Sequence, residues 1–130
     1  MSKYWLDYVK SCYDLVIESE KNTSIHLAHE IEAYIVHLMA RSFERVDIGV
    51  NPVAIKMLEA VESLNEHKLL SIADECLLIH SYPLKRHRWP CDTYYMNIGT
   101  TAYGLAHHYM EHNFQIASLV LSEIFKNNRS

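Results

Sequence analysis

Histidine and glutamate residues occur at helical spacing in two parts of the sequence. His108 and His112 are separated by four positions, and so are His26 and Glu30. Residues four apart share one face of an α-helix, so each pair is able to bind a transition metal from a single helix. The di-iron carboxylate proteins carry Glu-x-x-His on each of two helices, and this sequence contains no such motif. A metal site on these residues is therefore one interpretation, and ordinary surface or half-buried histidines are the other.

Cys91 is the cysteine whose surroundings favour reactivity. It follows Pro90 and precedes Asp92, where a helix is expected to begin, and basic residues lie just before it. A helix N-terminus and nearby cations favour the thiolate, whereas Asp92 opposes it. Cys12 and Cys76 fall on apolar helix faces and are expected to be small core residues. Three cysteines at irregular spacing do not predict a disulfide framework, so we expect reduced thiols in a cytoplasmic compartment.

A basic segment with a tryptophan, LKRHRW, is flanked by prolines. Arg86 and Arg88 are able to pair with carboxylates or phosphates, and Trp89 is of the type that anchors protein interfaces. Tyr94 and Tyr95 follow at the expected start of the next helix. So few cations would bind nucleic acid weakly and in a strongly salt-dependent way. An acidic protein partner is therefore the better functional interpretation, and a solvated loop is the alternative.

The composition predicts a single domain over residues 1–130. The formal net charge of −4 argues against a general nucleic-acid-binding protein, because such proteins are usually basic. No apolar run approaches the roughly 20 residues that span a bilayer, and the N-terminus lacks the apolar core of a signal peptide. We therefore expect a cytoplasmic protein without a membrane span, whose partner is another protein or a second copy of itself.

Apolar residues recur at three- and four-residue steps along almost the whole chain, which is typical of amphipathic helices. Only three glycines and three prolines interrupt the pattern. We predict an all-α fold, a compact bundle of five or six helices. Thr23 or Ser24 is expected to cap the second helix, and Asn51 and Asn65 the third and fourth. After a first helix that ends at the polar break 22–24, the predicted helices run to about residues 44, 64, 79, 112 and 126.

Two of these helices carry features that constrain packing. The helix after Asn65 is apolar around most of its circumference, so we expect it to be central and buried. In the helix after Asp92, Gly99, Ala102 and Ala106 share one face. A glycine inside a helix costs about 1 kcal/mol relative to alanine. We therefore expect the small residues to allow close approach of another helix.

One extended pattern resembles an uncharacterised family of small bacterial all-helical proteins. The pattern consists of Glu75-Cys76-Leu77-Leu78, Tyr82-Pro83 and Asp92-x-Tyr94-Tyr95-x-x-x-Gly99-x-x-Ala102-Tyr103, with the upstream run 32–41. The similarity covers roughly residues 25–107, and His80-Ser81 departs from the more apolar residues of that family. The resemblance implies a bacterial all-α protein and carries no activity.

The sequence contains no HExxH, GxGxxG, P-loop or paired-cysteine zinc motif. The favoured function is a non-catalytic binding or regulatory module, so we lean against an enzyme. Its contact residues would be Arg86, Arg88, Trp89, Tyr94 and Tyr95, and it needs no cofactor. The alternative is a histidine-rich bundle that binds a transition metal or a small ligand, either as an enzyme or without catalysis. Its metal ligands would be His108, His112, His26 and Glu30.

Overall fold

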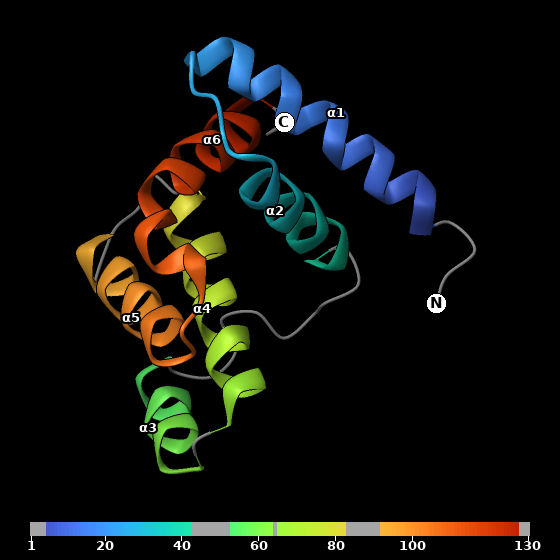
Figure 1. The fold of residues 1–130 in the computed structure, drawn as a ribbon. Helices are drawn as coiled ribbons and strands as arrows, with labels where there is room; N and C mark the ends of the chain where they lie inside the picture. The colour runs from blue at the N-terminus through green and yellow to red at the C-terminus, as the bar shows by residue number, and fades with distance from the viewer. Residues whose placement is uncertain (1–4, 43–52, 64, 83–91, 128–130) are drawn as a thin grey trace.

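The computed structural model describes residues 5–42, 53–63, 65–82 and 92–127. These residues form α-helices, one short 3-10 helix and no strand, which confirms the predicted all-α bundle (Figure 1). None of the helices in these ranges is both long enough and apolar enough to cross a bilayer. The elements are α1 (Trp5–Thr23), α2 (His29–Ser42), α3 (Val53–Ser63), α4 (Glu66–Ser81), α5 (Asp92–Leu105), the 3-10 helix η1 (Tyr109–His112) and α6 (Phe114–Asn127).

Helix α4 is the centre of the bundle, as its sequence predicts. It packs most extensively against α5 and also contacts α6 and α3 (Figure 1). Asn65 caps it as expected, because the Asn65 side chain accepts a 3.0 Å hydrogen bond from the Lys68 amide. Its buried side chains lie on all sides of the helix, since every residue from Ile72 to Leu78 is buried. The bundle therefore forms around one helix that is covered on several sides.

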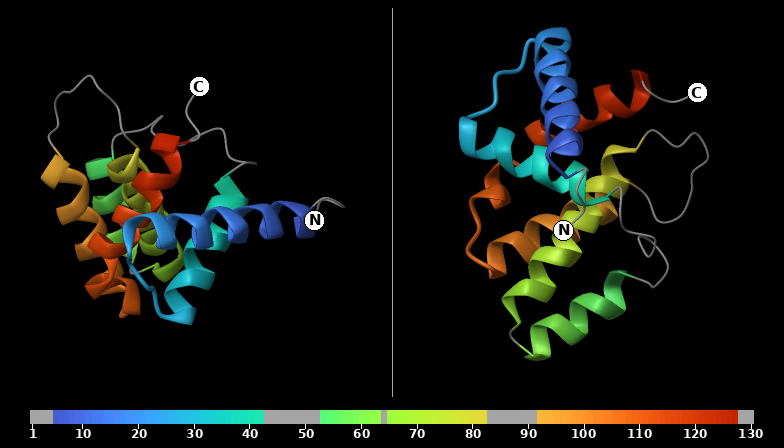
Figure 2. Two further views of the ribbon diagram at one scale, coloured as in Figure 1. Left: turned by 90° about the horizontal axis from the view of Figure 1, so that it is seen from above. Right: turned by 90° about the vertical axis from the view of Figure 1, so that its right-hand side faces the viewer.

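Helix α1 lies across α2 and α6, and one of its ends projects beyond the bundle (Figure 2). Cys12 and Val16 carry its buried face. The Ser19 hydroxyl donates a 2.7 Å hydrogen bond to the Val120 carbonyl of α6. Helix α1 thus packs on α2 and α6 through one face.

The turn between α1 and α2 differs from the prediction. Thr23 does not cap α2, since its hydroxyl donates back to the Ser19 carbonyl at 2.8 Å. Ser24 adopts a left-handed backbone with φ of 58°, and α2 begins only at His29. His26 therefore precedes the helix that was expected to contain it. The expected cap at Asn51 lies outside the described residues.

The predicted long helix through residue 112 was wrong at its end. Helix α5 ends at Leu105, and His107 turns the chain with φ of 55°. The His108 amide donates to the Tyr103 carbonyl at 2.9 Å, which closes the end of the helix. The His108 ring nitrogen Nδ1 then accepts a 3.2 Å hydrogen bond from the Met110 amide and caps η1. A histidine in the capping role is the local signal that the apolar periodicity did not reveal.

The close approach predicted at Gly99 is present. A Cβ atom on Gly99 would lie 2.6 Å from a ring carbon of Phe114 and 3.0 Å from the Cβ of Cys76. Ala102 and Ala106, on the same face, are also buried. The small residues on this face of α5 therefore allow α4 and α6 to pack closely against it. This packing compensates the free-energy cost of a glycine inside a helix.

Candidate functional site

A buried aspartate joins three helices at the centre of the protein. Asp74 of α4 is 4% exposed. Its Oδ1 atom accepts a 2.5 Å hydrogen bond from the hydroxyl of Tyr34 on α2 and a 2.6 Å bond from the hydroxyl of Tyr103 on α5. Its Oδ2 atom lies 3.7 Å from a guanidinium nitrogen of Arg41. Tyr34 and Arg41 are two helical turns apart on α2, so both reach the same carboxyl group.

The electrostatics of this cluster keep the tyrosines protonated. Burial raises the pKa of Tyr34 and of Tyr103, and the negative charge of Asp74 raises both further. Burial also raises the pKa of Asp74, while the hydrogen bonds from Tyr103 and Tyr34 and the charge of Arg41 oppose that shift. Both phenols therefore act as hydrogen-bond donors rather than as bases. The cluster is suited to fixing the packing of α2, α4 and α5.

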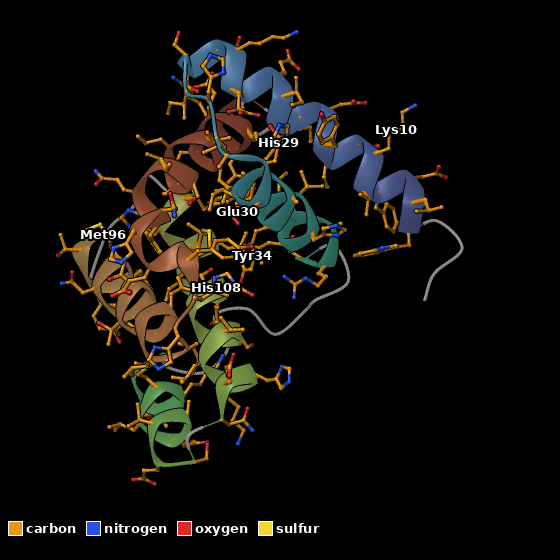
Figure 3. All side chains as sticks on the ribbon, in the orientation of Figure 1. Lys10, His29, Glu30, Tyr34, Met96 and His108 are labelled. Carbon is orange, nitrogen blue, oxygen red and sulfur yellow. The ribbon has the colours of Figure 1, made fainter. Side chains whose placement is uncertain are left out.

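His108 lies among the rings above this carboxyl group. Its ring centroid is 4.8 Å from that of Tyr34, 5.6 Å from that of Tyr103 and 4.2 Å from that of Tyr109. Figure 3 shows His108 and Tyr34 close to each other. Burial lowers the pKa of His108, and the charge of Asp74 opposes that shift. Since Nδ1 accepts from the Met110 amide, the neutral ring carries its proton on Nε2. The aromatic cluster thus holds a neutral histidine.

A second buried carboxyl group, Glu75, is paired. Lys56 of α3 donates a 2.8 Å hydrogen bond to Oε1 of Glu75, which ties α3 to α4. Next to it, burial raises the pKa of Cys76 to about 12, and burial also raises the pKa of Cys12. Both thiols are buried and stay protonated at neutral pH, as expected of core residues. Cys91 lies outside the described residues.

The residues proposed as metal ligands do not come together in one helical face. His26 precedes α2, and Glu30 is exposed on its first turn. His108 caps η1 and faces the tyrosines, while His112 is exposed and lies 3.5 Å from Glu111. Within the described ranges, no three His, Cys, Asp or Glu side chains are close enough to hold a metal ion together.

The residues proposed to contact a partner are described only in part. Arg86, Arg88 and Trp89 lie outside the described residues. Tyr94 and Tyr95 stand at the start of α5, half-buried, with their rings in an edge-to-face contact 5.0 Å apart. Tyr82, at the end of α4, is 44% exposed and packs against the ring of Phe125 at 5.6 Å. Exposed or half-exposed tyrosines therefore stand on both sides of the basic segment.

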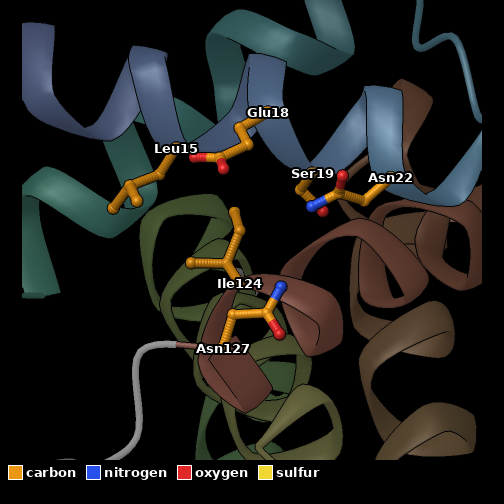
Figure 4. A pocket seen from close by; sticks show the side chains of 6 residues that line it. All are labelled: Leu15, Glu18, Ser19, Asn22, Ile124 and Asn127. Carbon is orange, nitrogen blue, oxygen red and sulfur yellow. The ribbon is translucent and has the colours of Figure 1, made fainter.

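A small cavity of about 170 Å³ lies between α1 and α6, and Figure 4 shows the side chains that line it. Its lining combines apolar and amide or carboxylate side chains: Leu15, Glu18, Ser19, Asn22, Ile124 and Asn127. The Asn127 amide donates to Glu123 at 2.8 Å, so part of this lining is already paired. The cavity has room for a few ordered water molecules.

Comparison of the chain with protein-family models, with curated proteins and with solved structures gave no match. Functional interpretation therefore depends on the residues of this chain and their arrangement.

The Asp74 cluster was missed by sequence reasoning, and one signal for it was available. An aspartate stands inside a helix that is otherwise apolar around most of its circumference. A buried carboxylate needs hydrogen-bond donors, so this position indicates partners elsewhere in the chain. Nothing in the local spacing of Tyr34 or Tyr103 identifies them as those partners, because they lie 40 and 29 residues from Asp74.

Proposed function

We propose that this protein is a non-catalytic binding or regulatory module. Its contact surface would be the basic segment 84–89 together with the tyrosines on either side of it, at one end of the α4–α5 pair. The observation that carries the proposal is the exposure of Tyr82 at the end of α4, with Tyr94 and Tyr95 half-buried at the start of α5. Tyrosine and arginine are the residues that most often dominate binding energy at protein interfaces.

The register between α4 and α5 supports a single surface. Asp74 contacts Tyr103, and Gly99 approaches Cys76. Helices α4 and α5 therefore run antiparallel, so Tyr82 lies near the level of Tyr94. Figure 1 shows the end of α4 and the start of α5 at the same end of the pair. The three tyrosines thus lie at the same end of the α4–α5 pair.

The charges of the segment favour an acidic partner. Lys85, Arg86 and Arg88 lie close together in the sequence of a chain whose formal net charge is −4. Arginine pairs with carboxylates through two parallel hydrogen bonds, and an adjacent aromatic ring supplies apolar contact. We therefore infer that the partner, in a cytoplasmic setting, presents carboxylates beside apolar side chains. A second copy of this acidic chain is one protein of that kind.

The test measures binding of a fluorescent peptide built from glutamate and leucine to the full chain, by anisotropy. We expect weak binding that decreases as salt is added. The variant R86S/R88S should weaken it about tenfold or more, and Trp89→Ala should weaken it at unchanged salt dependence. Lys10→Ser is the matched control, because Lys10 is exposed on α1 at a distance from this region (Figure 3).

If Lys10→Ser weakened peptide binding as much as R86S/R88S does, the proposal would be contradicted. Such a result would show that the peptide is attracted to positive charge anywhere on the protein. Sedimentation velocity of the same variants distinguishes the self-associating form of the proposal. A dimer in the parent protein that Trp89→Ala dissociates would identify the second copy as the partner. Unfolding curves in urea verify that each variant remains folded.

A further inference from the structure

Two buried glutamates lie within hydrogen-bonding reach of each other where α1 meets α2. Glu20 of α1 is 6% exposed and Glu32 of α2 is 9% exposed. Glutamate is almost never buried without a partner. This pair is independent of the surface proposed for binding and of the Asp74 cluster.

Glu20 organises the turn that follows α1. Its Oε2 atom accepts a 2.9 Å hydrogen bond from the Leu27 amide, and its backbone carbonyl accepts a 3.2 Å bond from the Ile25 amide. Its other carboxyl oxygen, Oε1, is buried without a hydrogen-bond partner among the described residues. A buried acceptor of this kind destabilises the fold if nothing donates to it.

The charged groups around the pair do not neutralise it. The imidazole of His29 comes within 4.0 Å of Glu32, but that side chain is fully exposed. Of the other charged residues, Glu18 and Lys21 on α1 and Glu30 on α2 are exposed. Helix α6, which packs against both, carries Glu123, paired with Asn127 in an exposed contact, and the exposed Lys126. The neighbouring carboxyl group of Glu32 is able to donate to Glu20 when it carries a proton.

We propose that Glu32 is protonated and donates to Glu20, and that this hydrogen bond fastens α1 to the bundle. Glu32 in its acid form donates to Oε1 of Glu20. When the proton leaves, two like charges face each other in a buried site, which disfavours the docked helix. Helix α1 then loosens while the α4-centred core stays folded.

The titration of Glu32 agrees with this geometry. Hydrogen bonding with Glu20, burial and the charge of Glu20 all raise the pKa of Glu32, and His29 opposes them. A carboxyl group whose pKa is raised on folding stabilises the fold fully below its unfolded pKa. That stabilisation is lost as the pH rises through the raised, folded-state pKa. Loosening of α1 is therefore expected on the alkaline side.

Helix α1 carries its own reporter. Cys12 is fully buried on α1, and Cys76 is fully buried on α4. The test measures the alkylation rate of each thiol by site-resolved mass spectrometry, from about pH 5 to about pH 8. Rates are divided by those of a free thiol to remove the intrinsic effect of thiolate formation. We expect the corrected Cys12 rate to rise by up to about tenfold per unit of pKa shift, and the Cys76 rate to stay level.

The variant Glu32→Gln places a permanent amide donor beside Oε1 of Glu20 and should keep the corrected Cys12 rate low at every pH. Glu30→Gln removes the same charge from the exposed side of the same turn and should behave as the parent protein does. A Cys12 rate that rises equally in the parent and in Glu32→Gln would overturn the proposal, as would Cys12 and Cys76 rising together. If Glu32→Gln does not fold, hydrogen exchange of the parent decides. If exchange accelerates with pH more in α1 than in α4, the result supports the proposal that the carboxyl pair holds α1 on the bundle. Equal acceleration in both helices refutes it.

Discussion

The hydroxyl of Tyr103 donates a 2.6 Å hydrogen bond to Oδ1 of Asp74 inside the core. Tyr103 is completely buried, so no water replaces this donor if it is removed. The hydroxyl of Tyr34 reaches the same oxygen from the opposite helix, but Tyr34 is only half-buried. One carboxyl oxygen thus connects α2, α4 and α5, and the two donors differ in their access to solvent.

Tyr103→Phe should lower the free energy of unfolding by about 1 to 3 kcal/mol, because a buried acceptor loses its donor. Tyr34→Phe should cost less, because water is able to reach its position. The hydrogen bond from Tyr103 lowers the pKa of Asp74, so its loss raises that pKa. The deficit of Tyr103→Phe should therefore be larger at neutral pH than in acid. Urea unfolding at both pH values measures it.

Tyr109→Phe provides the control for the loss of a hydroxyl group. Tyr109 is exposed, and its hydroxyl makes only a 3.5 Å contact with the Glu30 carbonyl. It should change the free energy of unfolding by less than about 0.5 kcal/mol. Equal effects of Tyr103→Phe and Tyr109→Phe would show that the Asp74 hydrogen bond does not stabilise the fold.

Gly99→Ala should destabilise the protein even though alanine is the better helix former. The new Cβ would lie 2.6 Å from the Phe114 ring and 3.0 Å from Cys76, closer than van der Waals contact allows. Overpacking of this kind costs about 1 to 3 kcal/mol, which exceeds the roughly 1 kcal/mol gained in helix propensity. Gly99→Leu should loosen or unfold the domain. The melting temperature and urea midpoint report both effects.

Gly104→Ala is the matched control on the same helix. Its Cβ would meet the carboxyl group of Glu111 at 2.7 Å, but Glu111 is an exposed, flexible side chain that is free to move. The substitution should be neutral or stabilising by up to about 1 kcal/mol. A similar loss at both glycines would mean that crowding against Phe114 is not the cause.

Helix positions followed from local patterns, and helix ends often did not. Apolar spacing predicted the helices and the central place of α4, and the local capping signal of Asn65 was correct. The end of α5 depends instead on the left-handed His107 and on a histidine ring that caps η1. Non-glycine residues rarely take that backbone conformation. The apolar spacing therefore predicted a continuous helix through His107, where the chain in fact turns.

The polar clusters show a different limit. The sequence marks Asp74 as unusual in an apolar helix, and Glu20 as one of several acidic residues on α1. Their partners come from other helices, and hydrogen bonds between segments that are distant in the sequence produce no recognisable residue spacing. The Gly99 stripe was predictable because it depends on one helix, whereas identifying Phe114 as the ring that fills the space required the fold.

His108 should make the protein less stable in mild acid. Burial lowers its pKa below the ordinary histidine value of 6.5. The unfolded chain therefore binds a proton at a higher pH than the folded chain does. The stabilisation that neutral His108 contributes is complete above the unfolded pKa, and it is lost as the pH falls toward the folded pKa. Protonation of Nδ1 would also remove the acceptor for the Met110 amide.

His108→Asn separates this effect from other titrations. Asparagine is a good helix-capping acceptor and has no charge in this range, so the Met110 amide keeps a partner. The variant should lose less unfolding free energy than the parent does between about pH 7 and pH 5. His112→Asn, on an exposed side chain of the same 3-10 helix, should keep the parent's pH dependence. Nuclear magnetic resonance titration of the His108 ring locates its pKa directly. A value at or above 6.5 would show that burial does not control this histidine.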